Sequence, residues 1–111
     1  MARDVVVGPG CYIGATAVVS IATEIGANVL LNSAGCLSHH NGIGDHVHIG
    51  PGVSTAGHVH VGAKTQIGIG GAILPGRTIG ARAAFVAGAV VTRDVPDGVT
   101  IVGSPARPLR I

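Results

Sequence analysis

The chain has 111 residues, a length that suits one domain at most. It contains 19 Gly and 6 Pro, which excludes a helical bundle because both residues interrupt helices. Tyr12 and Phe85 are the only aromatic residues, yet hydrophobic residues make up 47% of the chain and charged residues only 11%, which argues against disorder. The composition therefore predicts a narrow, aliphatic and repetitive core.

The net charge of +2 is small, but the charged residues are unevenly distributed along the chain. Residues 1–63 hold one Arg against three acidic side chains, whereas residues 64–111 hold six Lys and Arg against two Asp. The C-terminal part can therefore favour an anion, although dispersed basic groups that only aid solubility fit the same distribution. A basic run is absent and aromatic stacking surface is almost absent, so we expect no nucleic-acid partner.

Cysteine usage and hydropathy point to a soluble cytoplasmic protein. Cys11 and Cys36 are 25 positions apart, which matches no CxxC metal or redox spacing, and two cysteines are too few for a disulfide scaffold. The first residues lack the long apolar stretch of a signal peptide, and no segment approaches the roughly 20 apolar residues of a membrane span. We therefore expect reduced cysteines in or near the core and no membrane partner.

An aliphatic residue recurs at every sixth position from Val7 to Val91, with Thr55 as the one polar exception and no insertion. The fifteen positions of this ladder are Val7, Ile13, Val19, Ile25, Leu31, Leu37, Ile43, Ile49, Thr55, Val61, Ile67, Ile73, Ile79, Phe85 and Val91. Gly directly follows eight of them, and we interpret it as the start of a turn where a side chain is a liability.

A second column lies four positions after each ladder residue and is mostly small or β-branched, as at Ala17, Val29 and Val47. Two inward positions in every six residues fit a short strand followed by a corner, and neither a helix nor a long alternating strand keeps this phase. Successive units can then wind as a parallel solenoid in which each coil hydrogen-bonds to the coils above and below.

This pattern resembles the hexapeptide repeat, [LIV]-G-x-x-x-x, of the left-handed parallel β-helix in hexapeptide-repeat acyltransferases, and the resemblance covers nearly the whole chain. It implies an all-β fold in which three hexapeptides make one triangular coil, so residues 7–96 form about five coils of 18 residues. Residues 1–111 would then be one domain, with residues 97–111 as a capping tail. The left hand and a homotrimeric assembly also follow from the resemblance alone.

All six histidines lie between positions 39 and 60: His39, His40, His46, His48, His58 and His60. On a narrow prism most would be exposed, and we interpret His46, His58 and His60 as solvated polar surface. The γ-class carbonic anhydrases share this repeat and bind a metal through three His, but no two His here have that family's spacing of 5 or 36. His40 and His58, 18 apart, could stack on adjacent coils, yet two imidazoles make a weak site. We therefore expect no metal.

The segment 37–52, L-S-H-H-N-G-I-G-D-H-V-H-I-G-P-G, resembles the catalytic stretch of sugar acetyltransferases of the NeuD and PglD type. In that family a His followed by an acidic residue precedes I-G-[DE]-x-x-H, and the first His is the general base. The resemblance assigns this role to His39, and it places His48 in the acetyl pocket. His40 stands where the family has its acidic residue, so it would accept a hydrogen bond from His39 but stabilise an imidazolium less well than a carboxylate does.

The implied chemistry is acetyl transfer from acetyl coenzyme A to an amine or hydroxyl of a sugar or nucleotide sugar. A neutral imidazole can take the proton of the attacking group, an effect worth roughly 10² to 10⁴ in rate. The words G-A-V-V-T-R-D-V-P and V-G-S-P-A near the C-terminus resemble the family's ending. By this resemblance Gly70, Ala87, Gly88 and Arg107 line the donor groove, although turn and cap geometry would explain the same residues.

Two rival functions stay open. A non-catalytic trimeric scaffold would keep the prism without its chemistry, and His40 in place of an acidic residue favours it. A metalloenzyme of the γ-carbonic anhydrase kind is disfavoured by the His spacing. Nucleotide-sugar acetyltransferases of this family carry a preceding Rossmann-like domain that these residues do not include. We therefore expect a catalytic half, a single-domain relative, or a domain whose partner is another polypeptide.

Overall fold

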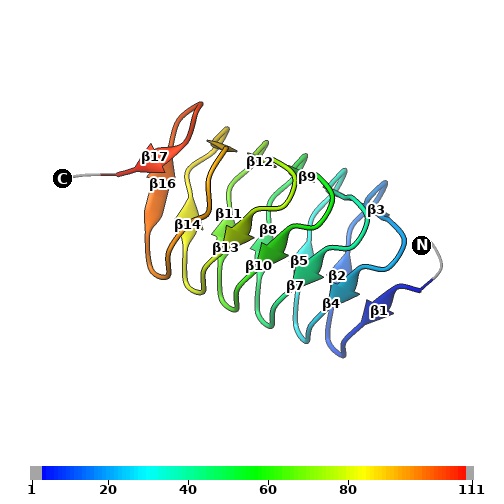
Figure 1. The fold of residues 1–111 in the computed structure, drawn as a ribbon. Coiled ribbons are helices and arrows are strands. Elements are labelled where there is room, and N and C mark those ends of the chain that lie inside the picture. The colour runs from blue at the N-terminus through cyan, green and yellow to red at the C-terminus, as the bar shows by residue number, and fades with distance from the viewer. Residues whose placement is uncertain (1–3, 110–111) are drawn as a thin grey trace.

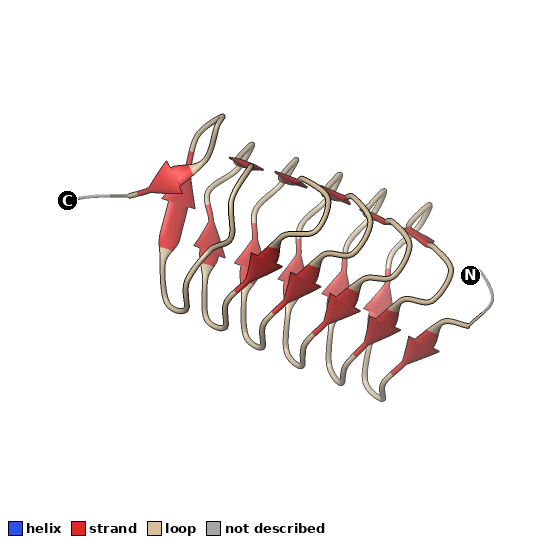
Figure 2. Ribbon diagram, in the orientation of Figure 1, coloured by secondary structure: helices blue, strands red, loops and turns tan. Residues whose placement is uncertain are grey.

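The computed structural model describes residues 4–109 and places them in an elongated prism of 41 × 23 × 21 Å (Figure 1). Within this range the chain forms short strands joined by turns and contains no helix (Figure 2). The described residues therefore include no helix that is long and apolar enough to cross a membrane. Each coil contributes one strand to each of three parallel sheets, which form the three faces of the prism.

The first face is a sheet of β1 (Val6–Val7), β4 (Glu24–Ile25), β7 (Gly42–Ile43), β10 (His60–Val61) and β13 (Thr78–Ile79). The second face is a sheet of β2 (Tyr12–Ile13), β5 (Leu30–Leu31), β8 (His48–Ile49), β11 (Gln66–Ile67), β14 (Ala84–Phe85), β16 (Thr100–Val102) and β17 (Arg107–Pro108). The third face is a sheet of β3 (Val18–Val19), β6 (Cys36–Leu37), β9 (Ser54–Thr55), β12 (Ala72–Ile73) and β15 (Val90–Val91).

The strand register confirms the 18-residue coil. Val7 pairs with Ile25, Ile25 with Ile43, and Ile43 with Val61, each 18 residues further along the chain. The fifteen strands from β1 to β15 make five triangular coils, and the structure confirms the left-handed β-helix that the repeat predicts. Residues 18 apart therefore lie side by side on adjacent coils.

The two inward columns of the sequence form the core. In each strand from β3 to β15 the second residue is the ladder residue and is buried, while the first is exposed or half-buried. The second column is buried as well: Val29, Val47, Val53, Val59 and Ala89 are at most 1% exposed. Phe85 is the one aromatic ring among the buried residues. The core is narrow and aliphatic because each coil supplies only two short side chains per face.

Every turn along the repeat uses a left-handed backbone conformation at its second residue. This residue is Gly at some corners, but ten non-glycine residues also have φ between 54° and 63°, among them His40, His46 and His58. Such angles are uncommon outside Gly, with Asn, Asp and His the most tolerant of the other residues. Three of the six histidines therefore occupy the same strained turn position.

The sequence suggests that Gly directly follows a ladder residue because a turn begins there, but the structure gives a different reason. At Gly62 a Cβ would lie 2.5 Å from the nitrogen of Ala81 and 2.6 Å from the carbonyl carbon of Gly80. Its φ is not left-handed. Gly is needed at this position because the backbone of the next coil approaches too closely for a side chain, and the turn itself begins one residue later.

The repeat changes after β15, close to the predicted boundary at residue 96. Val95 pairs with Ile79 and Ile101 with Phe85, a spacing of 16 residues instead of 18. β17 then returns antiparallel to β16 at the C-terminal end of the prism. β16 and β17 thus extend the second face beyond the last coil, and the capping tail of residues 97–111 stays a prediction. Residues 110–111 of that tail and residues 1–3 of the predicted domain lie outside the described range.

Candidate functional site

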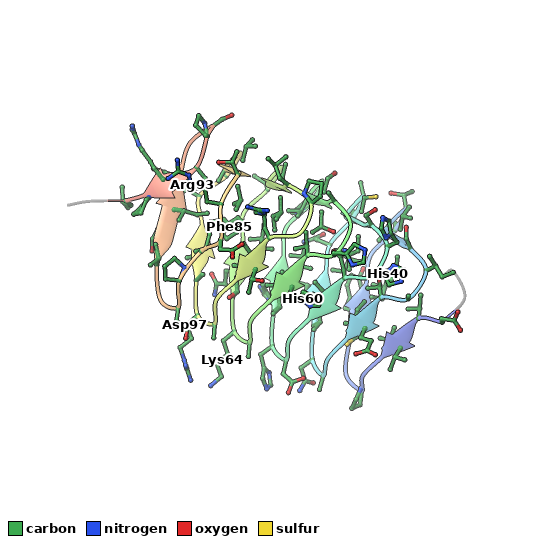
Figure 3. All side chains as sticks on the ribbon, in the orientation of Figure 1. His40, His60, Lys64, Phe85, Arg93 and Asp97 are labelled. Atoms are coloured by element: carbon green, nitrogen blue, oxygen red, sulfur yellow. The ribbon has the colours of Figure 1, made fainter. Side chains whose placement is uncertain are left out.

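Three of the histidines meet at one edge of the prism, where the chain passes from the third face to the first. His39 and His40 form the turn between β6 and β7, and His58 lies in the equivalent turn of the next coil, between β9 and β10. We call His39, His40 and His58 the histidine edge. Figure 3 labels His40 at this edge and His60 on the adjoining strand β10.

The three imidazoles of the histidine edge are in mutual contact. Nδ1 of His39 lies 3.1 Å from Nδ1 of His40, a distance that requires a proton between the two nitrogens. The ring of His58 stacks on His40 at a centroid distance of 4.9 Å and stands edge-on to His39 at 5.2 Å. The hydrogen-bonding contact expected between His39 and His40 is thus present, and so is the stacking expected from the 18-residue spacing.

A buried polar cluster of Thr23, Asn41 and Thr55 lies directly behind the histidine edge. Asn41 is 2% exposed, and its amide donates to the carbonyls of His39 (3.1 Å) and Ala56 (2.9 Å). Its side-chain oxygen accepts a hydrogen bond from the hydroxyl of Thr55. Because the prism interior is otherwise almost entirely apolar, this cluster is an exception there, and its hydrogen bonds fix the backbone of the histidine turn.

The other two members of the cluster hold Ser38 and Asn41, the residues on either side of the His39–His40 pair. The hydroxyl of Thr55 accepts a hydrogen bond from the backbone N–H of Ser38 at 3.2 Å. The hydroxyl of Thr23 donates to the carbonyl of Ser38 at 3.0 Å, and the backbone N–H of Asn41 approaches it at 3.4 Å. Three of the four buried polar residues in the described range therefore serve this one turn.

Gly57 makes room for the ring of His39. It occupies the turn position of the next coil that corresponds to His39, and it is buried although it lies in a turn. A Cβ on Gly57 would overlap Nε2 of His39 and lie 2.5 Å from its Cε1. The backbone N–H of His58 donates to the carbonyl of His39 at 3.1 Å, which joins the two turns. The imidazole of His39 therefore rests on the backbone of the neighbouring coil.

His48 lies away from the histidine edge, on the outer side of the second face. It is the first residue of β8, is exposed, and lines a shallow hollow of about 190 Å³ together with Leu30, Asn32 and Gln66. The prism edge that carries His39 joins the other two faces and is opposite this one. One chain thus does not bring His39 and His48 together.

Gly70, Ala87 and Gly88 lie along another edge, where the second face leads to the third. Gly70 and Gly88 are 18 apart, have φ of 70° and 75°, and nothing lies within 4 Å of a Cβ built on either. Arg107 belongs to β17 on the second face and lines a hollow of about 650 Å³ at the C-terminal end. The residues assigned to the donor groove therefore follow one side of the prism, the side that also carries His48.

The basic residues of the C-terminal half do not form one patch. Lys64 and Arg82 occupy turns between the first and second faces, whereas Arg93 follows β15 on the edge that also carries His39 (Figure 3). Cys11 and Cys36 are both free and half-buried. Cys11 packs against the core, and its Sγ lies 3.1 Å from the carbonyl oxygen of Gly26, in agreement with the inward position expected for it.

Sequence reasoning missed several residues that build the histidine edge. It assigned His58 to solvated surface, and it gave no role to Asn41, Thr55 or Gly57. The available signals were the one polar residue in the ladder, Thr55, and the amide residue in the second column, Asn41. The spacing of 18 between His40 and His58 had indicated that these two rings could stack, but not that His58 joins the site.

Comparison by sequence relates the chain to curated proteins named for a suspected acetyltransferase activity. C18B11.09c of Schizosaccharomyces pombe is 38% identical over 86 residues, which cover 61% of this chain and 42% of that protein. SACOL2570 of Staphylococcus aureus is 41% identical over 63 residues, covering 57% of this chain and 32% of that protein. No family model matches the chain.

Comparison by structure gives nearly complete coverage of this chain. PerB from Caulobacter crescentus, solved in complex with CoA and GDP-perosamine, is 33% identical with a TM-score of 0.86 over 97% of this chain and 55% of its own. The acetyltransferase domain of PglB from Neisseria gonorrhoeae, in complex with acetyl coenzyme A, is 35% identical with a TM-score of 0.84, covering 96% of this chain and 55% of its own.

The resemblance to hexapeptide-repeat acyltransferases is confirmed. A hexapeptide transferase family protein from Anaplasma phagocytophilum, 23% identical with a TM-score of 0.91, shows the same fold. The chain spans only about half the length of PerB and of the PglB acetyltransferase domain, and less than half the length of the two curated relatives.

Proposed function

We propose that the chain transfers an acetyl group from acetyl coenzyme A to an amine or hydroxyl of a sugar or nucleotide sugar, with His39 as general base. The neighbours that contain coenzyme A, acetyl coenzyme A or a nucleotide sugar support this donor and this acceptor class. The observation that carries the proposal for the base is the contact between Nδ1 of His39 and Nδ1 of His40 at 3.1 Å. A proton on Nδ1 of His39 leaves Nε2 with the lone pair that the reaction needs.

Acetyl transfer requires the attacking amine or hydroxyl to lose a proton as it adds to the thioester carbonyl. Nε2 of His39 takes this proton, and His40 accepts a hydrogen bond from the Nδ1–H of the imidazolium that forms. This arrangement replaces the carboxylate that the related catalytic stretch uses, so His40 orients His39 but contributes no negative charge. The hydrogen bonds that the side-chain amide of Asn41 and the backbone N–H of His58 donate to the carbonyl of His39 keep the base in place.

We further propose that the site is completed by a second copy of the chain in a homotrimer. His39 lies on one edge of the prism, and His48, Gly70, Ala87 and Gly88 lie on or beside the opposite face. A cleft between adjacent prisms can bring the base edge of one copy to the donor side of the next. Acetyl coenzyme A would then extend along the donor side toward Arg107. The cytoplasmic location that the sequence predicts stays a prediction.

The test is turnover of acetyl coenzyme A with a panel of amino sugars and nucleotide-linked amino sugars, measured as release of the free thiol. We expect His39→Ala to lower kcat by about 10² to 10⁴, the usual contribution of a general base. His46→Ala is the matched control because His46 is exposed at a different edge. A His39→Ala variant as active as the parent removes His39 from the base role, and no turnover with any acceptor favours a non-catalytic scaffold.

A further inference from the structure

The histidine edge offers three imidazoles to a single point in space within one chain. One ring nitrogen from each of His39, His40 and His58 can be chosen so that all three lie within 4.8 Å of one another. The side chains of all three are exposed, so an ion can reach them from solvent. The set consists of two residues adjacent in sequence and a third from the next coil. On the sequence alone, the histidines were compared only with the γ-carbonic anhydrase spacings and with a pair 18 apart, so this set of three was not considered.

We propose that the histidine edge binds one divalent transition-metal ion of the zinc type. A zinc–nitrogen bond is about 2.0–2.1 Å, so nitrogens that share one ion lie no more than about 4.2 Å apart. Nδ1 of His39 and Nδ1 of His40 already meet this limit at 3.1 Å. For all three to bind one ion, the exposed rings must rotate so that a nitrogen of His58 comes within the same range, from a starting set in which one nitrogen of each ring lies within 4.8 Å of the others. The fourth position of a tetrahedral ion stays open to water or substrate.

The backbone beneath the three rings is fixed before any ion binds. The carbonyl of His39 accepts hydrogen bonds from the amide of Asn41 and from the backbone N–H of His58. His40 is held to the preceding coil by a bond from its N–H to the carbonyl of Ile21, at 3.0 Å. The ligands are therefore carried by turns whose separation is set by the stacking of coils, which lowers the ordering cost of binding.

The surroundings of the edge leave space for the ion. The position equivalent to His40 and His58 is Ala22 in the preceding coil and Gly76 in the following coil, so the stack of these two rings is not continued by a large side chain at that position in either neighbouring turn. The ion takes the place of the proton between the two Nδ1 atoms, and that proton moves to the opposite nitrogen of its ring. Hard ions such as Mg²⁺ prefer oxygen ligands and would not compete for this site.

Occupancy of this site would engage the same imidazole that acts as base in the proposed acetyl transfer. Metal binding itself does not depend on the proposed function, because it needs only the three rings in one chain. If acetyl transfer also occurs, zinc should inhibit it in competition with the acceptor. Zinc binding without any turnover would contradict the proposed function alone, and turnover without zinc binding would contradict this inference alone.

The test uses the full chain without a polyhistidine tag, stripped with a chelator, and titrated with zinc chloride in a calorimeter. His58→Gly removes one ligand and suits the left-handed turn, where φ is 59°. His46→Gly is its matched control, because His46 is also exposed and has φ of 58° at another edge. Loss of a direct ligand should weaken zinc binding by at least about 10-fold, the lower limit seen even for outer partners of metal ligands.

We expect one zinc ion per chain for the parent and for His46→Gly, weaker binding for His58→Gly, and no displacement by magnesium chloride. Cobalt chloride gives a second measurement, since Co²⁺ at a site of three nitrogens and water shows visible absorption bands that His58→Gly should lose. Equal zinc affinity in the parent and His58→Gly would overturn the inference. An equal loss in His46→Gly and His58→Gly would overturn it as well.

Discussion

The imidazole of His40 stacks on the imidazole of His58, with ring centroids 4.9 Å apart and ring planes inclined by 20°. The two residues are 18 positions apart and have nearly the same φ, 56° and 59°. This relationship follows from the coil length, because equal turn positions of adjacent coils lie side by side. At the prism edges, side chains 18 positions apart in sequence can therefore contact each other.

The buried hydrogen bond between Asn41 and Thr55 should be visible as an energetic coupling. Asn41→Ala leaves the Thr55 hydroxyl and the carbonyls of His39 and Ala56 without these partners, and each buried polar group left unpaired costs about 1–3 kcal/mol. Thr55→Val in turn removes the hydroxyl that donates to the side-chain oxygen of Asn41 and accepts from the backbone N–H of Ser38. We expect the double variant to lose less stability than the sum of the single variants, by about 0.5–3 kcal/mol.

Urea denaturation of the four proteins measures this coupling. Thr65→Val provides the matched control, because Thr65 is also fully buried but bonds to the carbonyl of Gly80 and the N–H of Ala83. In the double variant Thr65→Val and Asn41→Ala, the losses of unfolding free energy of the two single variants should add within about 0.5 kcal/mol. Additivity for the Thr55 pair as well would show that the cluster does not act as a unit.

Substitution of Gly57 should disturb catalysis through the ring of His39. The new Cβ in Gly57→Ala overlaps that ring, which must rotate away, and a displacement of about 1 Å can cost about 10²-fold in rate. Gly42→Ala is the control, since its Cβ would press on Nδ1 of His60 at 2.6 Å, outside the histidine edge. The measurement is kcat for acetyl transfer with circular dichroism as a check on folding. Equal rates for the two variants would contradict the placement of His39.

The two classes of glycine should respond differently to substitution. Gly62→Ala forces backbone apart between coils, and overpacking of this kind costs about 1–3 kcal/mol, or more where the backbone cannot move. In Gly52→Ala the new Cβ has no atom within 4 Å, so the only cost is that of a non-glycine residue at a φ of 69°, about 1–2 kcal/mol of unfolding free energy. Urea midpoints should fall further for Gly62→Ala. A larger loss for Gly52→Ala would mean that turn conformation, and not coil spacing, requires the repeated Gly.

The fold was predictable because its periodicity is carried by single residues. The ladder from Val7 to Val91 places one residue, apolar in all but β9, in each strand from β1 to β15, and a second inward position follows four residues later, so coil length and register follow from counting. The left hand did not follow from the pattern, since the usual preference for parallel crossovers is right-handed. It depended on the family resemblance.

The site was only partly predictable for a physical reason. His39 and His40 were found through a local motif, and the stack of His40 on His58 through the period of 18. The support from Asn41 and Thr55 could not be derived, because these residues are 14 apart, which is not a multiple of the repeat, and their side chains meet inside the prism, with Asn41 in a corner and Thr55 in β9 of the adjacent coil. The separation of His39 from His48 within one chain likewise needs the three-dimensional order of the faces.

The central claim is that the base and the donor side come from different copies of the chain. It predicts that His39→Ala and His48→Ala, each nearly inactive alone, complement one another when they assemble together. In a cyclic trimer formed at random from equal amounts, about a quarter of the sites keep both native residues.

The most direct measurement is therefore the turnover of acetyl coenzyme A by the whole population of oligomers, not sorted by composition, that forms when His39→Ala and His48→Ala are co-expressed in equal amounts. The account predicts about a quarter of the parental activity, far above either variant alone. Mixed oligomers that are no more active than the average of the two variants would contradict a site shared between copies.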